Sequence, residues 1–271
     1  MGLIISLRAC RAQPSVPPRS FRVCQLSGVT LDQMPRPFLT AEWRYLAMLN
    51  YAIDPSLLRN LVPRGVELDQ FGGRTYVSLV GFRFLRTRVR GMWIPFHSDF
   101  NEVNLRFYVR RNHQGEVRRG VVFIREIVPR YAVAKVARVA FGENYIALPM
   151  HHLIVEDGGE AHVEYRWRAG GNWSSMYLKC SGAPQPAPEG SLDQFITEHY
   201  WGYAAQRNRS TVEYQVEHPR WQVWHAAAAG FSGDASALYG PSLAAELQRP
   251  PDSAFLADGS LVAVHAGVRL T

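Results

Sequence analysis

The sequence predicts an α+β fold that is mostly antiparallel β, a curved sheet or barrel with a few flanking helices. Three observations lead to this prediction. Residues 71–91, residues 101–109 and much of the chain after residue 145 show the two-residue period of β-strands. The loop "NHQGEV" has the length and composition of an antiparallel hairpin connection. Few helical patterns separate the strands, which argues against repeated strand–helix–strand units.

The first two expected elements are helices. Residues 40–50, "TAEWRYLAMLN", place Trp43 and Leu46 on one helical face. A short helix is expected in "DPSLLRNLVP", where Asp54 caps the first turn and a proline follows it at the first helical position. After a glycine pair, the pattern changes to a strand over residues 71–91.

The clearest predicted strand is residues 101–109. One face carries Glu102, Asn104, Arg106 and Tyr108, and the other carries Val103, Leu105, Phe107 and Val109. Two interpretations stay open. The polar face is the solvated side of a half-buried strand, or it lines a polar cavity in a small barrel that holds one ligand. In a cavity, the buried opposite charges would need each other.

A helix of about twelve residues is predicted at 130–141, because Pro129 suits its first turn and Gly142 follows its last apolar residue. Its expected buried stripe is Val133, Val136, Ala137 and Ala140. Strand-like runs then continue to the C-terminus. Two further helices are expected among them, one after Ser191, which has the capping-box spacing to Gln194, and one in "PSLAAELQR".

Composition sets the class of protein. The 271 residues are 47% hydrophobic and 20% charged, values typical of a globular domain. A chain of this length can bury a core without disulfides or a structural metal ion. Three scattered cysteines argue against a disulfide framework and favour a reducing, cytoplasmic compartment. No apolar run approaches the roughly 20 residues of a membrane span, so we expect no membrane partner. The net charge of +7 is weak evidence for a nucleic-acid partner.

Residues 1–34 are predicted to be an extension to a domain at 35–271. The segment is rich in Arg, Ser and Pro and has a single acidic residue, Asp32. We interpret it as a disordered or non-native extension, with Met34 as the natural start, because the periodic pattern begins only there. The alternative is a targeting segment, although its apolar run "LIISL" is shorter than a secretory core.

Several chemistries lack the residues that they need. His151 and His152 are neighbours and would point to opposite faces of a strand, so they cannot share one metal ion. No Gly-x-Ser-x-Gly elbow and no phosphate-binding glycine loop is present. We interpret the basic stripe Arg86, Arg88 and Arg90 as a solvated edge rather than a nucleic-acid site. We therefore expect no metal, no cofactor and no nucleic-acid partner.

Residues 137–150, "ARVAFGENYIALPM", gather polar side chains where the predicted helix ends. Arg138 lies among apolar residues, and Glu143 and Tyr145 follow Gly142. On these residues alone, an arginine that bonds the last carbonyls of the helix explains Arg138, at under about 1 kcal/mol. A catalytic role for this segment needs support from elsewhere in the chain.

Four separated motifs supply such support. "YVSLVGFRF", "FNEVNLRFYV", "GVVFIRE" and "AVAKVARVAFGENYIALPM" resemble, in order and spacing, the YqjF-like family of uncharacterised bacterial proteins. The resemblance runs from about Phe38 to Thr271. That family looks like a branch of the acetoacetate decarboxylase fold, a folded antiparallel β structure around a polar cavity. The resemblance therefore implies that the polar face of residues 101–109 lines a cavity.

The resemblance also implies which residues stand at the decarboxylase positions. Glu102 in "FNEVN" matches a cavity glutamate, and Arg138 matches the arginine of a Gly-Arg-Glu motif. Tyr145 and Ile146 fall where the decarboxylases have a lysine pair, whose first member forms a Schiff base with the β-keto acid. The imine chemistry is then absent, because tyrosine cannot form a Schiff base. Lys135 is expected to be a surface residue.

We therefore expect a small-molecule-binding domain whose polar cavity takes an anionic or carbonyl-containing ligand. Asn104 and Arg106 would bind the ligand, the arginine through paired hydrogen bonds. The alternative is a lyase or hydratase-type enzyme that acts on an oxo or hydroxy acid. Its acid–base residues would be Glu102, Arg138, Glu143 and Tyr145. The enzyme requires a carboxyl group with a strongly shifted pKa beside a positioned donor, whereas the binding module does not. Oligomerisation stays open.

Overall fold

The computed structural model describes residues 36–270, and the extension expected at 1–34 lies outside this range. The strands are β1 (Leu39–Ile53), β2 (Glu67–Leu68), β3 (Thr75–Val89), β4 (Met92–Trp93), β5 (Phe100–His113), β6 (Glu116–Val128), β7 (Tyr145–Ala147), β8 (Met150–Asp157), β9 (Glu160–Ala169), β10 (Asn172–Ser181), β11 (Gln185–Pro186), β12 (Trp201–Ala205), β13 (Thr211–Glu217), β14 (Gln222–Ser232), β15 (Ser253–Val264) and β16 (Val268–Arg269). The helices are the 3-10 helix η2 (Pro55–Leu58) and the α-helices α1 (Tyr131–Phe141), α2 (Leu192–Thr197), α3 (Ser236–Tyr239) and α4 (Pro241–Gln248).

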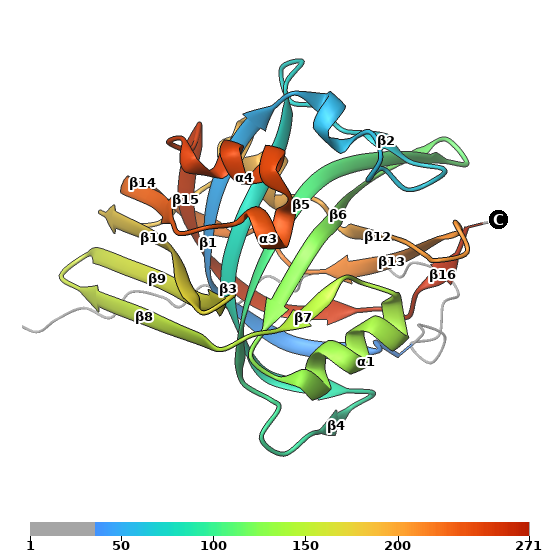
Figure 1. The fold of residues 1–271 in the computed structure, drawn as a ribbon, viewed down its shortest axis with the longest axis horizontal. Coiled ribbons are helices and arrows are strands. Elements are labelled where there is room, and N and C mark those ends of the chain that lie inside the picture. Colours follow the sequence, from blue (N-terminus) through green and yellow to red (C-terminus); the bar gives the residue numbers. More distant parts are fainter. Residues whose placement is uncertain (1–35, 271) are drawn as a thin grey trace, which may run out of the picture. The chain divides into compact units, whose positions relative to one another are not determined.

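The described strands form one sheet in the order β16–β13–β12–β6–β5–β3–β1–β15–β14–β10–β9–β8, with four short strands paired at its sides. Strand β13 also pairs with β15. Strands β15, β1, β3, β5, β6, β12 and β13 therefore make a closed hydrogen-bonded circuit (Figure 1). Most pairs are antiparallel, while β12 and β7 each run parallel to β6. The predicted fold class, mostly antiparallel β with a few helices and a cone-like or barrel-like sheet, is confirmed.

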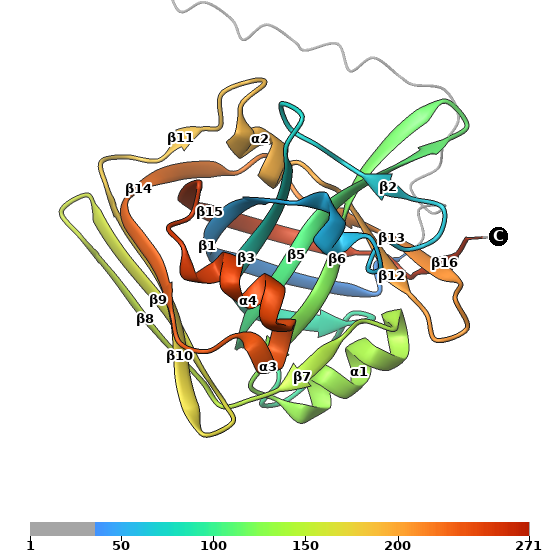
Figure 2. The same ribbon diagram turned by 45° about the horizontal axis from the view of Figure 1, so that its top comes forward.

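Beyond β15, the sheet continues through β14, β10, β9 and β8 as a wing at one side of the molecule (Figure 2). The wing packs on the outer face of the circuit, where Tyr165 and Trp167 join the same buried cluster as Leu79 and Leu105. Gly81 on β3 permits this approach, because a Cβ there would lie 2.5 Å from the Tyr165 ring. A second apolar cluster lines the inside of the circuit. Each face of β5 is therefore buried.

The helix expected at residues 40–50 is wrong, because this segment is strand β1, paired with both β3 and β15. A central strand buried on two faces lacks the alternation of a half-exposed strand. The register of β1 against β3 is also irregular between Arg44 and Ala47, where Tyr45 has a φ of 56°. This β-bulge moves the apolar residues out of a two-residue period, so that they imitate a helical face.

The helix predicted at residues 130–141 is confirmed as α1. It ends at Gly142, whose φ of 72° is left-handed and whose N–H bonds to the carbonyl of Arg138. The predicted buried stripe is wrong in part, since Val136 is exposed and α1 instead buries Ala134 and Phe141. The reason is that α1 covers the opening of a cavity rather than a filled core.

The other predicted helices are also present. Asp54 accepts a hydrogen bond from the backbone N–H of Ser56 at 2.8 Å and caps η2. Ser191 accepts from the N–H of Gln194 at 3.2 Å and caps α2, which is short because the chain enters β12 soon after it. The segment "PSLAAELQ" forms α4. None of the helices among residues 36–270 has the length and apolar character that a membrane span requires.

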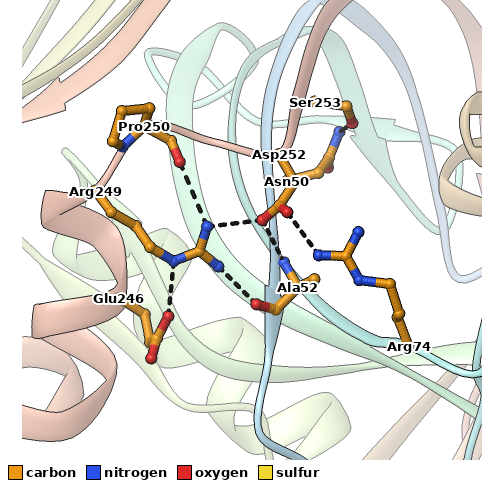
Figure 3. A network of polar contacts seen from close by, with 8 residues as sticks. All are labelled: Asn50, Ala52, Arg74, Glu246, Arg249, Pro250, Asp252 and Ser253. Carbon is orange, nitrogen blue, oxygen red and sulfur yellow. Dashed lines mark hydrogen bonds and ion pairs between the residues drawn. The ribbon is translucent and has the colours of Figure 1, made fainter.

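A polar network joins the end of α4 to the central strands (Figure 3). Arg249 donates to Glu246 at 2.8 Å, to Asp252 at 2.7 Å and to the carbonyl of Ala52 at 2.6 Å. Asp252 in turn accepts from Arg74 at 2.7 Å and from the N–H of Ala52 at 2.9 Å. The network fixes the turn before β15 on the end of β1, and so helps to hold two strands of the circuit in register.

Candidate functional site

A cavity of about 230 Å³ lies inside the strand circuit. Its walls are mostly apolar and aromatic, and the side chains that face it include Trp43, Phe82, Phe84, Phe100, Phe123, Trp201 and Trp221. The polar residues Glu102, Asn104 and Arg106 of β5 also line it. Of the two interpretations of this strand, the structure therefore agrees with the second, in which the polar face lines a cavity. The volume lies below the usual range of ligand pockets, so the space suits a small ligand.

Glu102 is the best-connected acid of the cavity. Its Oε1 accepts a hydrogen bond from Asn104 Nδ2 at 3.0 Å, and its Oε2 accepts one from the Tyr145 hydroxyl at 3.0 Å. Asn104 is next on the same face of β5, and Tyr145 comes from β7, which follows α1. The structure thus joins the polar strand and the segment after Gly142 in one site.

Two further carboxyl groups surround this pair. Glu143 accepts a hydrogen bond from the Tyr214 hydroxyl of β13 at 2.7 Å. Glu126 of β6 stands opposite Asn104 on one side and Tyr145 on the other, and its Oε2 has no hydrogen-bond partner among the described residues. Three buried acids and two tyrosines therefore share one end of the cavity.

Sequence reasoning missed Glu126 because of a β-bulge. Strand β5 pairs regularly with β6 from the hairpin turn to Arg106, which stands opposite Phe123. Strict alternation from Phe123 would then turn Arg125 into the cavity. One residue is inserted at the bulge, so Asn104 faces Glu126 and the glutamate takes that place. Alternation in "GVVFIREIV" carries no sign of this insertion.

Burial shifts the titration of the acids upward. Desolvation raises the pKa of Glu102 to about 7, although hydrogen bonds from Asn104 and Tyr145 and the charge of Arg106 act against it. Desolvation also raises the pKa of Glu143 to about 8. The pKa of Glu126 is raised well above its usual range by burial and then by the charges of the other two acids. Near neutral pH, Glu126 and Glu143 therefore keep their protons for the most part and can donate hydrogen bonds, whereas Glu102 is divided between its protonated and its ionised form.

Arg106 is the one arginine or lysine among the described residues that line the cavity. Its Nη2 donates to the carbonyl of Ile196 at 3.2 Å, and its guanidinium lies 5.6 Å from the centre of the Tyr108 ring. Its Nε has no hydrogen-bond partner in the described part of the chain. With Glu126 and Glu143 protonated, the charges in the cavity are those of Arg106 and of the ionised fraction of Glu102.

Two histidines near Arg106 were not predicted as cavity residues; from the sequence, His218 was considered only as a metal ligand with His225 and was set aside. The Nε2 of His199 lies 3.2 Å from Asp69 Oδ2, and burial lowers the pKa of His199 to about 4. His218 stacks on Trp221, and burial lowers its pKa to about 4 as well. Both rings are therefore neutral at neutral pH. The signal available in the sequence was a histidine beside aromatic residues, which is too common to indicate a site.

Arg138 is not brought into the cavity with the other candidates. It is exposed on α1, where its Nε donates to the carbonyl of Ala134 at 3.3 Å and its guanidinium lies 5.9 Å from the centre of the Tyr131 ring. The two lysines of the sequence, Lys135 and Lys179, are both exposed and neither lines the cavity. Between residues 36 and 270, no cluster of His, Cys, Asp or Glu has the arrangement of a metal site.

Several solved structures of enzymes have a similar fold. The acetoacetate decarboxylase of Legionella pneumophila has a TM-score of 0.62 at 12% identity, over 92% of this chain and 93% of that one. An acetoacetate decarboxylase-like enzyme from Sphingomonas wittichii has a TM-score of 0.61 at 13% identity, over 90% and 99%. The enduracididine biosynthesis enzyme MppR, in complex with pyruvate, has a TM-score of 0.59 at 13% identity, over 88% and 91%. At such identities the likeness shows the fold alone.

Sequence relatives give the family. The uncharacterized protein YqjF of Bacillus subtilis is 28% identical over 190 residues, which cover 69% of this chain and 75% of YqjF. The family model DUF2071, described as an uncharacterized conserved protein, matches residues 40–260, which is most of the chain. The chain is therefore a member of the DUF2071 family, with a fold like that of acetoacetate decarboxylase.

Proposed function

We propose that the cavity binds a small, largely apolar molecule that carries a carbonyl group, with or without a carboxylate as a second polar group. The observation that carries the proposal is the hydrogen-bonded Glu102–Tyr145 pair in the wall of an otherwise apolar cavity. Protonated Glu102 and the Tyr145 hydroxyl have two donor protons between them; one makes their mutual hydrogen bond, and the other can be donated to a carbonyl oxygen of the ligand. The apolar walls suit the remainder of such a ligand.

Arg106 supports a carboxylate as the second polar group of the ligand. Its free Nε offers a charge-assisted hydrogen bond, which is about twice as strong as a neutral one. The three acids oppose an anion only when they are ionised. Burial keeps Glu126 and Glu143 mostly protonated near neutral pH, and Glu102 becomes mostly protonated below about pH 7. A solved structure of this fold, MppR, holds pyruvate, which has both a carbonyl and a carboxylate group.

The ligand is bound without a Schiff base in this proposal. A lysine amine would have to reach the bound carbonyl, and neither Lys135 nor Lys179 lines the cavity. Tyr145 lies in the cavity wall, at the position where the resemblance would place the Schiff-base lysine of a decarboxylase. Its hydroxyl can polarise a carbonyl oxygen but cannot form an imine.

An acid–base enzyme is the second candidate, and one observation favours it. Glu102 has a pKa of about 7 beside the donor Tyr145, and a general acid or base works best when its pKa is close to the working pH. In a lyase or hydratase-type reaction, Glu102 would remove or return the proton while Tyr145 stabilises the developing charge on oxygen.

A thermal-shift screen tests the proposal. The probes are pairs of oxo and hydroxy acids with the same apolar tail, together with the matching ketones and alcohols. Ligands that bind only the native state raise the unfolding midpoint. We expect oxo acids and ketones to raise the midpoint, and a flat response across the whole set would contradict the proposal. Proton NMR of the same mixtures shows whether any compound is converted, and borohydride trapping on a lysine would refute the claim that no imine forms.

A further inference from the structure

The loop between β3 and β5 exposes apolar side chains to solvent. Of the five residues 92–96, four are large and apolar, and the fifth is a proline. The exposed fractions are 65% for Met92, 58% for Trp93 and 86% for Phe96. A cluster of this kind is uncommon on the surface of a protein that works alone in water, and it marks a contact surface.

The loop is held in place rather than collapsed on the protein. Thr87 N–H donates to the Ser98 carbonyl at 3.0 Å, His97 N–H donates to the Ile94 carbonyl at 3.1 Å, and Asp99 accepts from Arg86 N–H at 2.7 Å. Phe96 has a φ of 62°, a left-handed conformation that costs free energy in a residue other than glycine. The backbone thus presents the Phe96 side chain to solvent although burial would be more favourable.

Helix α1 continues the same surface. Tyr131, Val136 and Val139 are exposed on it, and the exposed fraction of Val139 is 81%. Ile94 of the loop and Val136 of α1 are both exposed and both line the cavity. The loop with β4 and the helix are therefore the two sides of the cavity mouth, as their neighbouring positions in Figure 1 also indicate. The apolar surface outside is continuous with the apolar walls inside.

Basic residues flank this surface along the chain. The segments 86–99 and 130–139 contain six basic residues, Arg86, Arg88, Arg90, Arg130, Lys135 and Arg138, and one acid, Asp99. Arg86 is ion-paired with Glu42 of β1, which leaves the other five to provide the positive charge. The carboxylate of Asp99 accepts a hydrogen bond from the backbone N–H of Arg86. Apolar side chains within a basic fringe match the surface of an anionic membrane, where the apolar groups enter the interface and the cations meet the lipid headgroups.

We propose that the cavity mouth docks on anionic membrane surfaces, with Trp93 and Phe96 entering the interface. The apolar cavity then opens toward the lipid phase, from which a largely apolar ligand can enter. A second copy of the chain fits less well, because a two-fold contact would set the same basic fringe against itself. The proposal departs from the expectation of no membrane partner, which rested only on the lack of a spanning segment.

Vesicle sedimentation tests the docking with the full chain. Wild-type protein is mixed with vesicles of phosphatidylcholine alone or with one part in four of phosphatidylglycerol. We expect it to pellet with the anionic vesicles at low salt and to be released by high salt. The variant Trp93→Ser/Phe96→Asn removes both apolar groups, and asparagine tolerates the left-handed backbone at 96. It is expected to lower the bound fraction, as is Arg88→Glu/Lys135→Glu, each by about tenfold or more.

Matched controls separate this surface from general effects. Val117→Ser changes a residue of similar exposure, 57%, on the β5–β6 hairpin. Arg168→Glu/Arg207→Glu makes the same change in net charge at exposed positions outside the two segments. Both should bind like wild type. The proposal is overturned if wild type ignores anionic vesicles, or if the loop variant binds as wild type does. It is also overturned if sedimentation velocity shows a wild-type dimer that Trp93→Ser/Phe96→Asn dissociates, since the surface is then a self-contact.

Discussion

The Tyr145 hydroxyl donates a hydrogen bond to Glu102 Oε2 at 3.0 Å, and so connects β7 to the polar face of β5. The pKa of Tyr145 is raised by burial and then by the charge of Glu102, so the hydroxyl keeps its proton. The bond favours the ionised form of Glu102, which burial disfavours. The titration of Glu102 near pH 7 is the balance between burial and the opposing effects of the Asn104 and Tyr145 hydrogen bonds and the Arg106 charge, and it can be tested without knowledge of the ligand.

Tyr145→Phe should raise the pKa of Glu102 above its wild-type value of about 7. The variant removes a hydrogen bond that stabilises the Glu102 carboxylate and leaves the burial of Glu102 unchanged. The protonated form of Glu102 is therefore favoured more strongly than in wild type. Carboxyl carbon NMR of a protein labelled at glutamate, titrated from acid to alkaline pH, measures the change.

Tyr214→Phe is the matched control for this prediction. It removes the hydroxyl that bonds to Glu143 at 2.7 Å and should raise the pKa of Glu143, with a smaller effect on Glu102. If both variants move both resonances equally, the acids respond to a general change in the cavity and not to their own tyrosines.

The parts of the fold that the sequence could predict are those with a simple local cause. Strand β5 has alternating faces, and α1 has a proline before it and a glycine after it, so both were predictable. Strand β1 was not, because burial on both faces and a bulge at Tyr45 remove its alternation.

The site follows the same rule. Glu102, Asn104 and Arg106 share one face of a regular strand and were predictable as a group. Glu126 depends on a bulge, and Tyr214 comes from a distant strand that only the closed circuit brings to Glu143. Arg138 was proposed from a motif resemblance, which gives position along the chain but not which face of α1 the residue occupies.

Glu143→Gln should change how stability depends on pH. The pKa of Glu143 is raised from 4.5 to about 8 in the folded protein. A group with a raised folded pKa stabilises the fold fully below the unfolded pKa, and this contribution is lost as pH rises to the folded pKa. A tenfold difference in proton affinity between the folded and unfolded states corresponds to about 1.4 kcal/mol. Glutamine stays neutral and still accepts the Tyr214 hydrogen bond, so the variant avoids this loss.

Urea unfolding at a series of pH values measures the effect. The free energy of unfolding of Glu143→Gln minus that of wild type should increase from about pH 5 to about pH 8. His199 and His218, which have lowered pKa values, titrate in both proteins and largely cancel in the difference. A difference that stays constant with pH would show that Glu143 ionises in the folded protein as easily as in the unfolded chain.

Arg106→Met should weaken binding of carboxylate ligands, whereas Arg138→Ala should leave it unchanged. Arg106 lines the cavity, and Arg138 is exposed on α1 outside it. Loss of a charge-assisted hydrogen bond costs about 1.5–3 kcal/mol, or roughly tenfold to a hundredfold in affinity. Isothermal titration with the best carboxylate from the thermal-shift screen compares the two. Equal losses in both variants would place the carboxylate away from Arg106.

Gly142→Ala should destabilise the protein more than Gly91→Ala. Both glycines have left-handed φ angles, 72° and 79°, so each substitution carries a backbone cost of about 1 kcal/mol or more. A Cβ at Gly91 meets nothing within 4 Å, whereas a Cβ at Gly142 meets the Gln206 side chain. Gln206 donates to the carbonyl of Phe141 at 3.0 Å and helps to end α1, so the substitution also disturbs the wall of the cavity.

A double-mutant cycle isolates that contact. Measured by urea unfolding in a Gln206→Ala background, Gly142→Ala should cost about as much as Gly91→Ala does in wild type, because only the backbone cost remains. An extra cost that persists without the Gln206 side chain would mean that the strain at Gly142 is in the backbone itself. In that case the left-handed turn, and not the packing around it, sets the direction in which Glu143 and Tyr145 leave the helix and enter the cavity.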